Sequence, residues 1–133
     1  MSKSNLSYRY RDLPDEIPVF PLSGVILLPH GQLPLNIFEP RYLAMIDTAL
    51  CGDRIIGMVQ PENMIERITP DTAALHQTGC AGRITAFEET GDGRYLVTLS
   101  GICRFSIAEE LPMTNGFRRI RPEWAAYACD LAP

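Results

Sequence analysis

The stretch Leu33–Leu50, LPLNIFEPRYLAMIDTAL, joins two hydrophobic periods at one proline. In Leu33–Phe38, apolar side chains at every second position predict a strand with one face on a core. Pro34 restricts that strand to a sheet edge or a bulge, because proline lacks the N–H that a central strand needs. The sequence therefore predicts an edge strand that is followed directly by a helix.

The helical spacing begins at Pro40, whose fixed φ and missing N–H suit the first turn of a helix. Glu39 places a negative charge near the positive end of the helix dipole, and Gly52 is a typical helix end. The pattern predicts one amphipathic helix of about three turns that packs on the sheet. Its apolar face consists of Tyr42, Leu43, Ile46, Ala49 and Leu50.

Short apolar runs on both sides of this stretch are broken by Pro and Gly, which is typical of a β-rich domain. Gly91–Gly93 contains Asp-Gly between two β-prone runs and predicts a hairpin turn. It lacks the following helix that a phosphate-binding loop needs. Gly101 is a candidate bulge that turns the sheet. The further expected strands are Ile17–Phe20, Val25–Leu28, Arg54–Gln60, Arg83–Glu88, Tyr95–Ser100, Ile102–Ile107 and Phe117–Arg121.

Two polar segments stand apart from this pattern. Residues 1–12 are expected to form a mobile N-terminal tail, and residues 13–133 a single domain. Pro61–Thr78 contains two prolines and no sustained periodicity. A segment of this kind in a compact domain indicates a functional or mobile loop.

The composition excludes several enzyme classes. The 133 residues are 46% hydrophobic, which is enough for a sizeable core, and the net charge is −4. The basic residues comprise eleven arginines and a single lysine, Lys3, within the polar N-terminal run. Phosphate-loop nucleotidases, Ser-Lys hydrolases and Schiff-base enzymes each need a well-positioned lysine. We therefore expect a protein that is not an enzyme.

Neither a membrane segment nor a metal site is predicted. No apolar run approaches the length of a membrane span, and the N-terminus lacks the apolar stretch of a signal peptide, so the expected location is the cytoplasm. The histidines His30 and His76 lie far apart in the sequence, outside any metal-binding pattern. The four cysteines are also widely spaced, which predicts free thiols. They are Cys51, Cys80, Cys103 and Cys129.

Several motifs together resemble the N-terminal substrate-binding domain of Lon proteases. The most specific are IPVFPL at Ile17–Leu22 and LNIFEPRY at Leu35–Tyr42. Supporting segments are GCAGRI at Gly79–Ile84, DGRY at Asp92–Tyr95 and LSGICRF at Leu99–Phe105, which recur in stand-alone bacterial members of the family. The resemblance covers roughly residues 13–131.

The resemblance implies a mainly β fold with one principal helix (α+β), a PUA-like pseudo-barrel of about six strands. It also implies a non-catalytic module that binds unfolded or exposed apolar polypeptide segments without cofactor or metal. A separate ATPase or protease is an open partner, since the modules that carry those activities in Lon are not in this sequence. A peptidase label would therefore come from the family name alone.

The sequence departs from the family at three places. His30 stands where the family often has Gly, and Asn36 stands where a basic residue is common. Family members tend to continue into a helical extension, whereas this sequence stops at Pro133. We expect either a minimal domain or a truncated one, in which part of a binding groove would be missing.

Most signature residues are expected to be structural. Glu39 and Arg41 would tie the strand end to the barrel, because partly buried charges need fixed partners. No second carboxylate or histidine lies near Glu39 in the sequence, so a general acid at this position is disfavoured. The signature set consists of Pro21, Phe38, Glu39, Pro40, Arg41, Tyr42, Gly82, Arg83, Gly101, Arg104 and Phe105.

Four apolar residues are candidates for peptide binding: Leu33, Leu35, Phe38 and Tyr42. They could line a groove for apolar segments, while the edge strand adds backbone hydrogen bonds to an extended peptide. The competing interpretation places most of them in the core, because both the strand and the helix periods point inward. Only a contiguous exposed patch would favour binding.

The alternative function is nucleic-acid binding, since PUA-like barrels include RNA binders. Arg118, Arg119 and Arg121, with Phe117 and Trp124 nearby, form a basic and aromatic cluster of the kind that single strands use. The acidic net charge disfavours this function, and fold analogy alone does not establish it. The competing interpretation is a solvated strand face.

Overall fold

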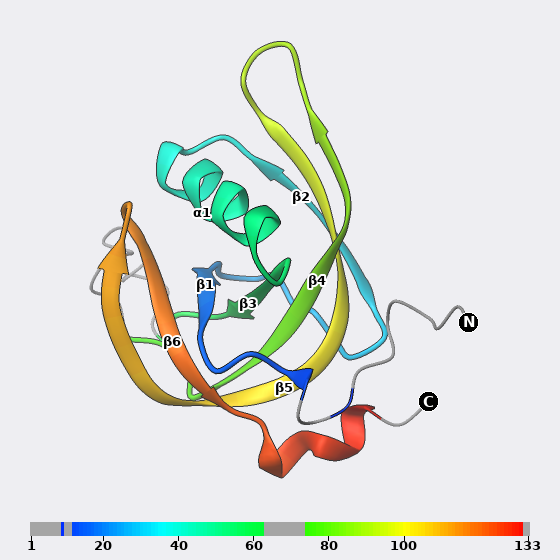
Figure 1. Cartoon of the computed structure of the whole chain (residues 1–133), viewed down its shortest axis with the longest axis vertical. Coiled ribbons are helices and arrows are strands. Elements are labelled where there is room, and N and C mark those ends of the chain that lie inside the picture. The colour runs from blue at the N-terminus through cyan, green and yellow to red at the C-terminus, as the bar shows by residue number, and fades with distance from the viewer. Residues whose placement is uncertain (1–8, 10–11, 63–73, 132–133) are drawn as a thin grey trace.

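The computed structural model describes residues 9, 12–62 and 74–131 (Figure 1). Most of the predicted tail and the centre of the predicted Pro61–Thr78 loop lie outside these residues. The described part is mainly β, with strands β1 (Ile17–Pro21), β2 (Gln32–Ile37), β3 (Ile55–Val59), β4 (Thr78–Glu89), β5 (Tyr95–Thr114) and β6 (Phe117–Glu123), helix α1 (Pro40–Cys51) and the 3-10 helix η3 (Ala125–Leu131).

The six strands form one sheet in the order β2-β5-β4-β3-β1-β6, and β6 also pairs with β5. This second pairing closes five of the strands into a ring, which confirms the predicted pseudo-barrel of about six strands. All pairings are antiparallel except the parallel pair of β1 and β3. Helix α1 lies over one end of the ring, where it contacts β1 and β6 (Figure 1).

Strand β2 is an edge strand, as predicted from Pro34. It pairs with β5 over Tyr95–Ser100, and β6 pairs with β5 further along, over Ser106–Thr114. Because β4 pairs with β5 over Tyr95–Ser106, β2 and β6 share the other edge of β5. One edge of β2 therefore pairs with no strand among the described residues.

The alternation of β2 and the extent of α1 are confirmed, but the helix face differs in detail, because Leu43 and Leu50 are half-buried while Met45 is fully buried. Leu35 and Ile37 are buried, whereas Pro34 and Asn36 are exposed. The helix begins at Pro40, with Glu39 as its N-cap and Gly52 as its C-cap. Its buried face consists of Tyr42, Met45, Ile46 and Ala49.

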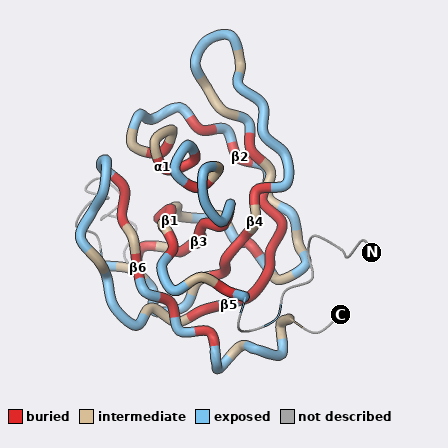
Figure 2. The backbone as a smooth tube through the Cα atoms, viewed as in Figure 1, coloured by how far each residue is buried: buried red, intermediate tan, exposed pale blue. Residues whose placement is uncertain are grey.

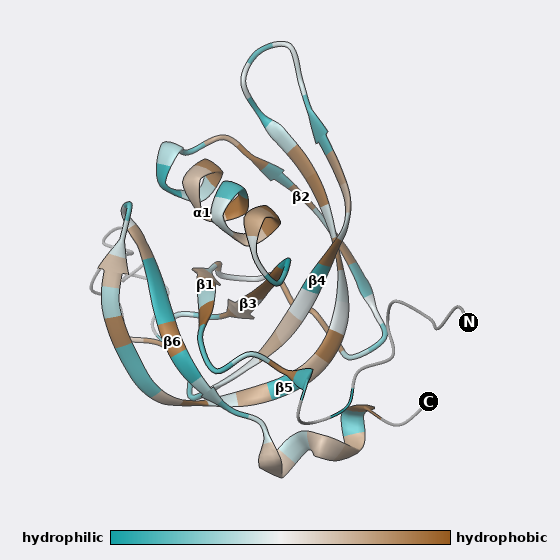
Figure 3. Cartoon of the chain, in the orientation of Figure 1, coloured by the Kyte–Doolittle hydropathy of each residue, from teal (hydrophilic) through white to brown (hydrophobic). Residues whose placement is uncertain are grey.

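The hydrophobic core lies along the strands of the ring and consists of two clusters. Figure 2 shows buried residues along the inner strands, and Figure 3 shows that β3, all of whose residues are buried, is apolar. One cluster lies under α1 and includes Tyr42, Met45 and Leu99. A second cluster lies toward η3 and includes Phe105 and Trp124.

Two strand predictions were wrong. Val25–Leu28 is a loop, in which only Leu27 is buried while Ile26 and Leu28 are exposed. The two predicted strands on either side of Gly101 are one continuous strand, β5. The bulge itself is confirmed, because the pair Gly82–Gly101 follows the pair Ala81–Cys103 and leaves one extra residue on β5.

Gly101 is required by a close backbone approach. The amide of His30 donates to the Gly101 carbonyl at 3.0 Å, and the Gly101 amide donates to the Gly31 carbonyl at 2.8 Å. A Cβ at this position would lie 2.0 Å from the Leu28 carbonyl oxygen. The loop that follows β1 is thus held against the bulge, which is why a residue without a side chain is needed there.

Candidate functional site

A groove lies between the end of β1, the free edge of β2 and the start of α1. Its volume is about 380 Å³. Strand β2 and helix α1 are consecutive in the sequence, and β1 reaches them because β2 and β6 share one edge of β5, which places the end of β1 opposite β2. The lining residues are Phe20, Pro21, Leu22, Ser23, Pro34, Leu35, Asn36, Ile37, Phe38, Glu39 and Tyr42.

The floor of the groove is aromatic and aliphatic. The rings of Phe20 and Tyr42 lie with their centroids 4.3 Å apart at 35°. Both rings are buried, as are Leu35 and Ile37. Such a floor offers dispersion contacts and a dry surface to an apolar side chain that enters from solvent.

Phe38 stands at the rim with 65% of its surface exposed. It follows the last residue of β2 and continues the outward set of Pro34 and Asn36, so the strand alternation directs it away from the core. Transfer of a large aromatic side chain out of water is favourable. Phe38 is therefore the part of the groove that a ligand would bury most.

The structure brings three of the four predicted peptide-binding residues to the groove. Leu35 and Tyr42 belong to its buried floor, and Phe38 forms its exposed rim. Leu33 does not line the groove; it is partly buried and packs against the core. No local pattern pointed to Phe20 and Leu22, because β1 reaches the groove only through the closure of the ring.

Glu39 and Arg41 form a long ion pair across the start of the helix. The Nε of Arg41 lies 3.9 Å from the Glu39 carboxylate, and both side chains are partly exposed. The Arg41 guanidinium also lies 5.8 Å from the centroid of the Tyr42 ring. Its Cβ is 3.3 Å from the position of a Cβ on Gly116, which places Arg41 beside the turn between β5 and β6. This arrangement fits the predicted role of joining the strand end to the barrel.

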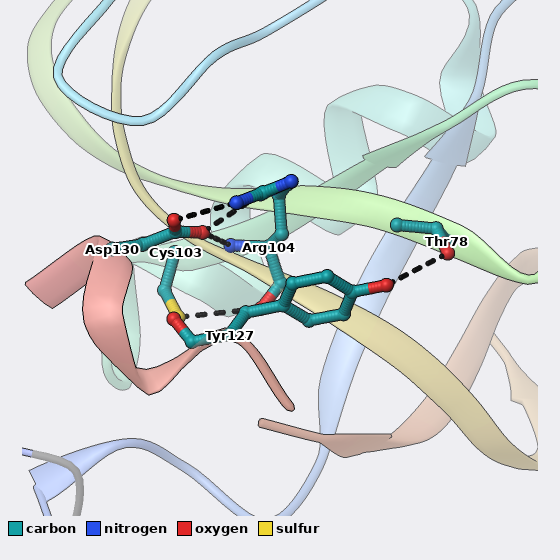
Figure 4. A network of polar contacts seen from close by, with 5 residues as sticks. All are labelled: Thr78, Cys103, Arg104, Tyr127 and Asp130. Atoms are coloured by element: carbon teal, nitrogen blue, oxygen red, sulfur yellow. Dashed lines mark hydrogen bonds and ion pairs between the residues drawn. The ribbon is translucent and has the colours of Figure 1, made fainter. Parts of the chain in front are cut away.

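The opposite end of the ring holds the signature residue Arg104 in a polar network (Figure 4). Its guanidinium donates to both carboxylate oxygens of Asp130 at 2.9 Å, and its amide donates to the same carboxylate at 3.0 Å. The guanidinium also stacks on Tyr127, 4.8 Å from the ring centroid. Tyr127 in turn bonds Thr78 at 3.2 Å. This network fastens η3 to β4 and β5.

The hydrogen bonds from Arg104 hold the pKa of the Asp130 carboxyl below its usual value. Burial raises the pKa of the Cys80 thiol to about 12 and that of the Cys103 thiol to about 11. Thiols with such values are protonated at neutral pH and are poor nucleophiles. The two buried thiols therefore stay protonated beside the Arg104–Asp130 pair.

Two further signature residues, Phe105 and Gly82, are buried. The Phe105 ring is fully buried and meets Trp124 edge-on, with centroids 6.0 Å apart. A Cβ on Gly82 would lie 2.8 Å from the Leu27 side chain, so the loop after β1 packs closely over this glycine. Both positions serve packing.

The basic and aromatic cluster predicted for nucleic acid is not an open cationic surface. Each arginine is paired with a glutamate: Arg118 with Glu110 at 2.6 Å, Arg119 with Glu16 at 3.1 Å and Arg121 with Glu109 at 2.7 Å. The nearby aromatic rings, Phe117 and Trp124, are buried. The rings therefore have little surface for base stacking, and the arginine charges are locally balanced.

Over the described ranges, no group of three or more His, Cys, Asp or Glu side chains is placed to hold a metal ion. In the same part of the chain, no helix has the length and apolar character needed to cross a membrane.

The part of the chain that forms the ring and the groove is similar to known proteins. The family described as the "ATP-dependent protease La (LON) substrate-binding domain" matches residues 16–126. Lon protease 2 of Myxococcus xanthus is 31% identical over 98 residues, which are 74% of this chain and 12% of that protein. Lon protease of Flavobacterium johnsoniae is 30% identical over 116 residues, 84% of this chain and 14% of that protein. The chain thus spans a small part of the relatives it matches.

Solved structures show the same fold. A Lon N-terminal domain protein from Xanthomonas campestris superposes with a TM-score of 0.66 at 25% identity, over 82% of this chain and 59% of that one. The N-terminal domain of the Mycobacterium avium complex Lon protease superposes with a TM-score of 0.63 at 14% identity, over 82% of this chain and 54% of that one.

Proposed function

Because the chain belongs to the family of Lon substrate-binding domains, we propose that its groove recognises exposed apolar segments of unfolded polypeptides. The observation that carries this proposal is the exposed Phe38 ring above the buried floor of Phe20 and Tyr42. An apolar side chain of the client would lie on that floor and cover Phe38. Folded proteins bury such side chains, so the groove would select unfolded ones.

The free edge of β2 would supply the second part of the interaction. An extended segment placed along this edge forms backbone hydrogen bonds that do not depend on its sequence. Pro34 has no N–H, so it contributes only its carbonyl to such a ladder. Ordering a flexible client costs much of the contact energy, and we expect affinities on the order of micromolar or weaker.

The proposal includes recognition without catalysis. Glu39 is held beside Arg41, two of the four thiols have raised pKa values, and the single lysine lies in the N-terminal run. In this proposal, a separate ATPase or protease acts on the bound client. The purified chain is expected to leave casein intact with or without ATP; proteolysis that survives repurification would contradict this.

The direct test is an amide NMR titration of the labelled chain with a permanently unfolded polypeptide. We expect shift changes at Phe20–Ser23 and Pro34–Tyr42, with few at the loop around Leu28. Leu28 is the matched control, because its side chain is 62% exposed, nearly as much as Phe38, and lies outside the groove. Leu28→Ala should bind as the wild type does. Shifts centred on Leu28, or no shifts at millimolar polypeptide, would overturn the proposal.

A further inference from the structure

The groove continues over β2 onto the other side of the sheet. Pro34, Leu35 and Asn36 line both the groove and a shallow depression of about 460 Å³. This second surface, called the outer face below, is formed by side chains that point away from the core on three neighbouring strands. They are Pro34, Asn36, Ala86, Glu88, Leu96 and Thr98.

The strand register sets three of these side chains in a straight row. Asn36 of β2 pairs with Leu96 of β5, and Leu96 pairs with Glu88 of β4. Neighbouring strands lie about 4.8 Å apart, so Glu88 is about 10 Å across the sheet from Asn36. Leu96 lies between them with 39% of its surface exposed, so it offers an apolar contact to a chain that crosses the row.

The charge along this row is negative at its far end. Glu88 is exposed, and among the described residues no cationic group lies within 4 Å of its carboxylate. At the hairpin turn, Asp92 and Arg94 pair with each other at 3.0 Å. Arg83 belongs to another row, since it pairs with Ser100. A ligand that crosses the row therefore meets an apolar contact first and a carboxylate second.

We propose that preferred clients carry a lysine or arginine four to six residues from the apolar anchor; this rests on the proposed function of the groove. Client residues before the anchor pair along the free edge of β2, and the anchor lies in the groove. After the anchor, the chain turns across β2 at Pro34 and Asn36, contacts Leu96 and brings its cation to Glu88. The span of about 10 Å from Asn36 to Glu88 takes about three residues of an extended chain at about 3.3 Å each, and one to three further residues connect the anchor to Asn36. The cation then pairs with a carboxylate that otherwise faces solvent.

The test uses three peptides that share one apolar anchor and one polar spacer and differ at the fifth following position, which is Lys, Gln or Glu. Affinities are measured with the full chain by NMR titration. The Lys peptide should bind about two- to five-fold more tightly than the Gln peptide, the range of a solvent-exposed ion pair. The Glu peptide should bind more weakly than both, and the differences should shrink at high salt.

Glu88→Gln and Glu89→Gln form a matched pair of variants. Each variant removes one negative charge at an exposed position of β4. The two side chains point to opposite faces of the sheet, because consecutive strand residues alternate. The preference for Lys should disappear in Glu88→Gln and persist in Glu89→Gln. Amide spectra and sedimentation of each variant check the fold and the oligomeric state.

The outcomes separate this inference from the function on which it rests. If all three peptides bind equally, or if both variants lose the preference equally, the inference is overturned and the groove remains. If none of the peptides binds, the proposed function fails as well. If Glu88→Gln changes self-association of the chain and leaves peptide affinity unchanged, the outer face binds a second copy and the inference is overturned.

Discussion

Phe38 and Phe105 both belong to the family signature, yet they lie in contrasting regions of the molecule. Phe105 is fully buried next to Trp124, at the end of the ring where Arg104 fastens η3. Phe38 is 65% exposed at the rim of the groove. In the first region, the polar groups are hydrogen-bonded and the apolar groups are buried by other residues of the chain. In the second region, the apolar ring of Phe38 remains largely in solvent. We therefore expect signature residues of the first kind to maintain the fold and those of the second kind to be available for binding.

The largest expected loss of stability is at Phe105. Phe105→Ala should lower the free energy of unfolding by about 3 to 5 kcal/mol, because a fully buried ring is replaced by a cavity. Denaturant unfolding measures the loss. A change of less than about 1 kcal/mol would show that this end does not carry the stability assigned to it.

The next effect is expected at Gly101. Gly101→Ala places a Cβ against the Leu28 carbonyl oxygen and forces the backbone apart, with an expected loss of about 1 to 3 kcal/mol. Gly91→Ala is the matched control, because a Cβ there meets nothing within 4 Å. Equal thermal stability of the two variants would contradict the close approach at the bulge.

The third effect, at Asp130, concerns how stability depends on pH. Asp130→Asn should lower stability at neutral pH by about 1 to 2 kcal/mol, since it weakens charged hydrogen bonds at a partly exposed site. The folded-state pKa of Asp130 is depressed, so its contribution is present above the unfolded value near 3.8 and is lost as pH falls through the folded value. Unfolding curves of wild type and variant should therefore converge below about pH 4; a constant difference would contradict the pairing.

Much of the fold was predictable from local patterns. The edge strand and the helix of Leu33–Leu50 followed from alternation, Pro34 and Pro40, all of which act through neighbouring residues. The hairpin of β5 and β6 was missed, although Asn115 and Gly116 both have positive φ and Asn-Gly is a strong hairpin signal. Polar residues before that turn masked the strand, because Glu109 and Glu110 pair with arginines of β6 and do not pack into a core.

The candidate site was predictable only in part. Phe38 and Tyr42 were identified because the strand and helix periods meet there. Phe20 and Leu22 could not be assigned to the groove, because they reach it through the pairing of β1 with β3 and β6. The arginines of β6 were misleading in isolation, since glutamates from β5 and from before β1 pair with them.

Phe38→Ala shows whether Phe38 serves binding and is dispensable for the fold. Both the free energy of unfolding and the Kd for an unfolded polypeptide would be measured on the same variant. We expect a Kd about ten-fold higher, the loss expected when an aromatic anchor is removed, with the free energy of unfolding changed by less than about 0.5 kcal/mol. Unchanged affinity, or a loss of stability comparable to that of Phe105→Ala, would contradict this expectation.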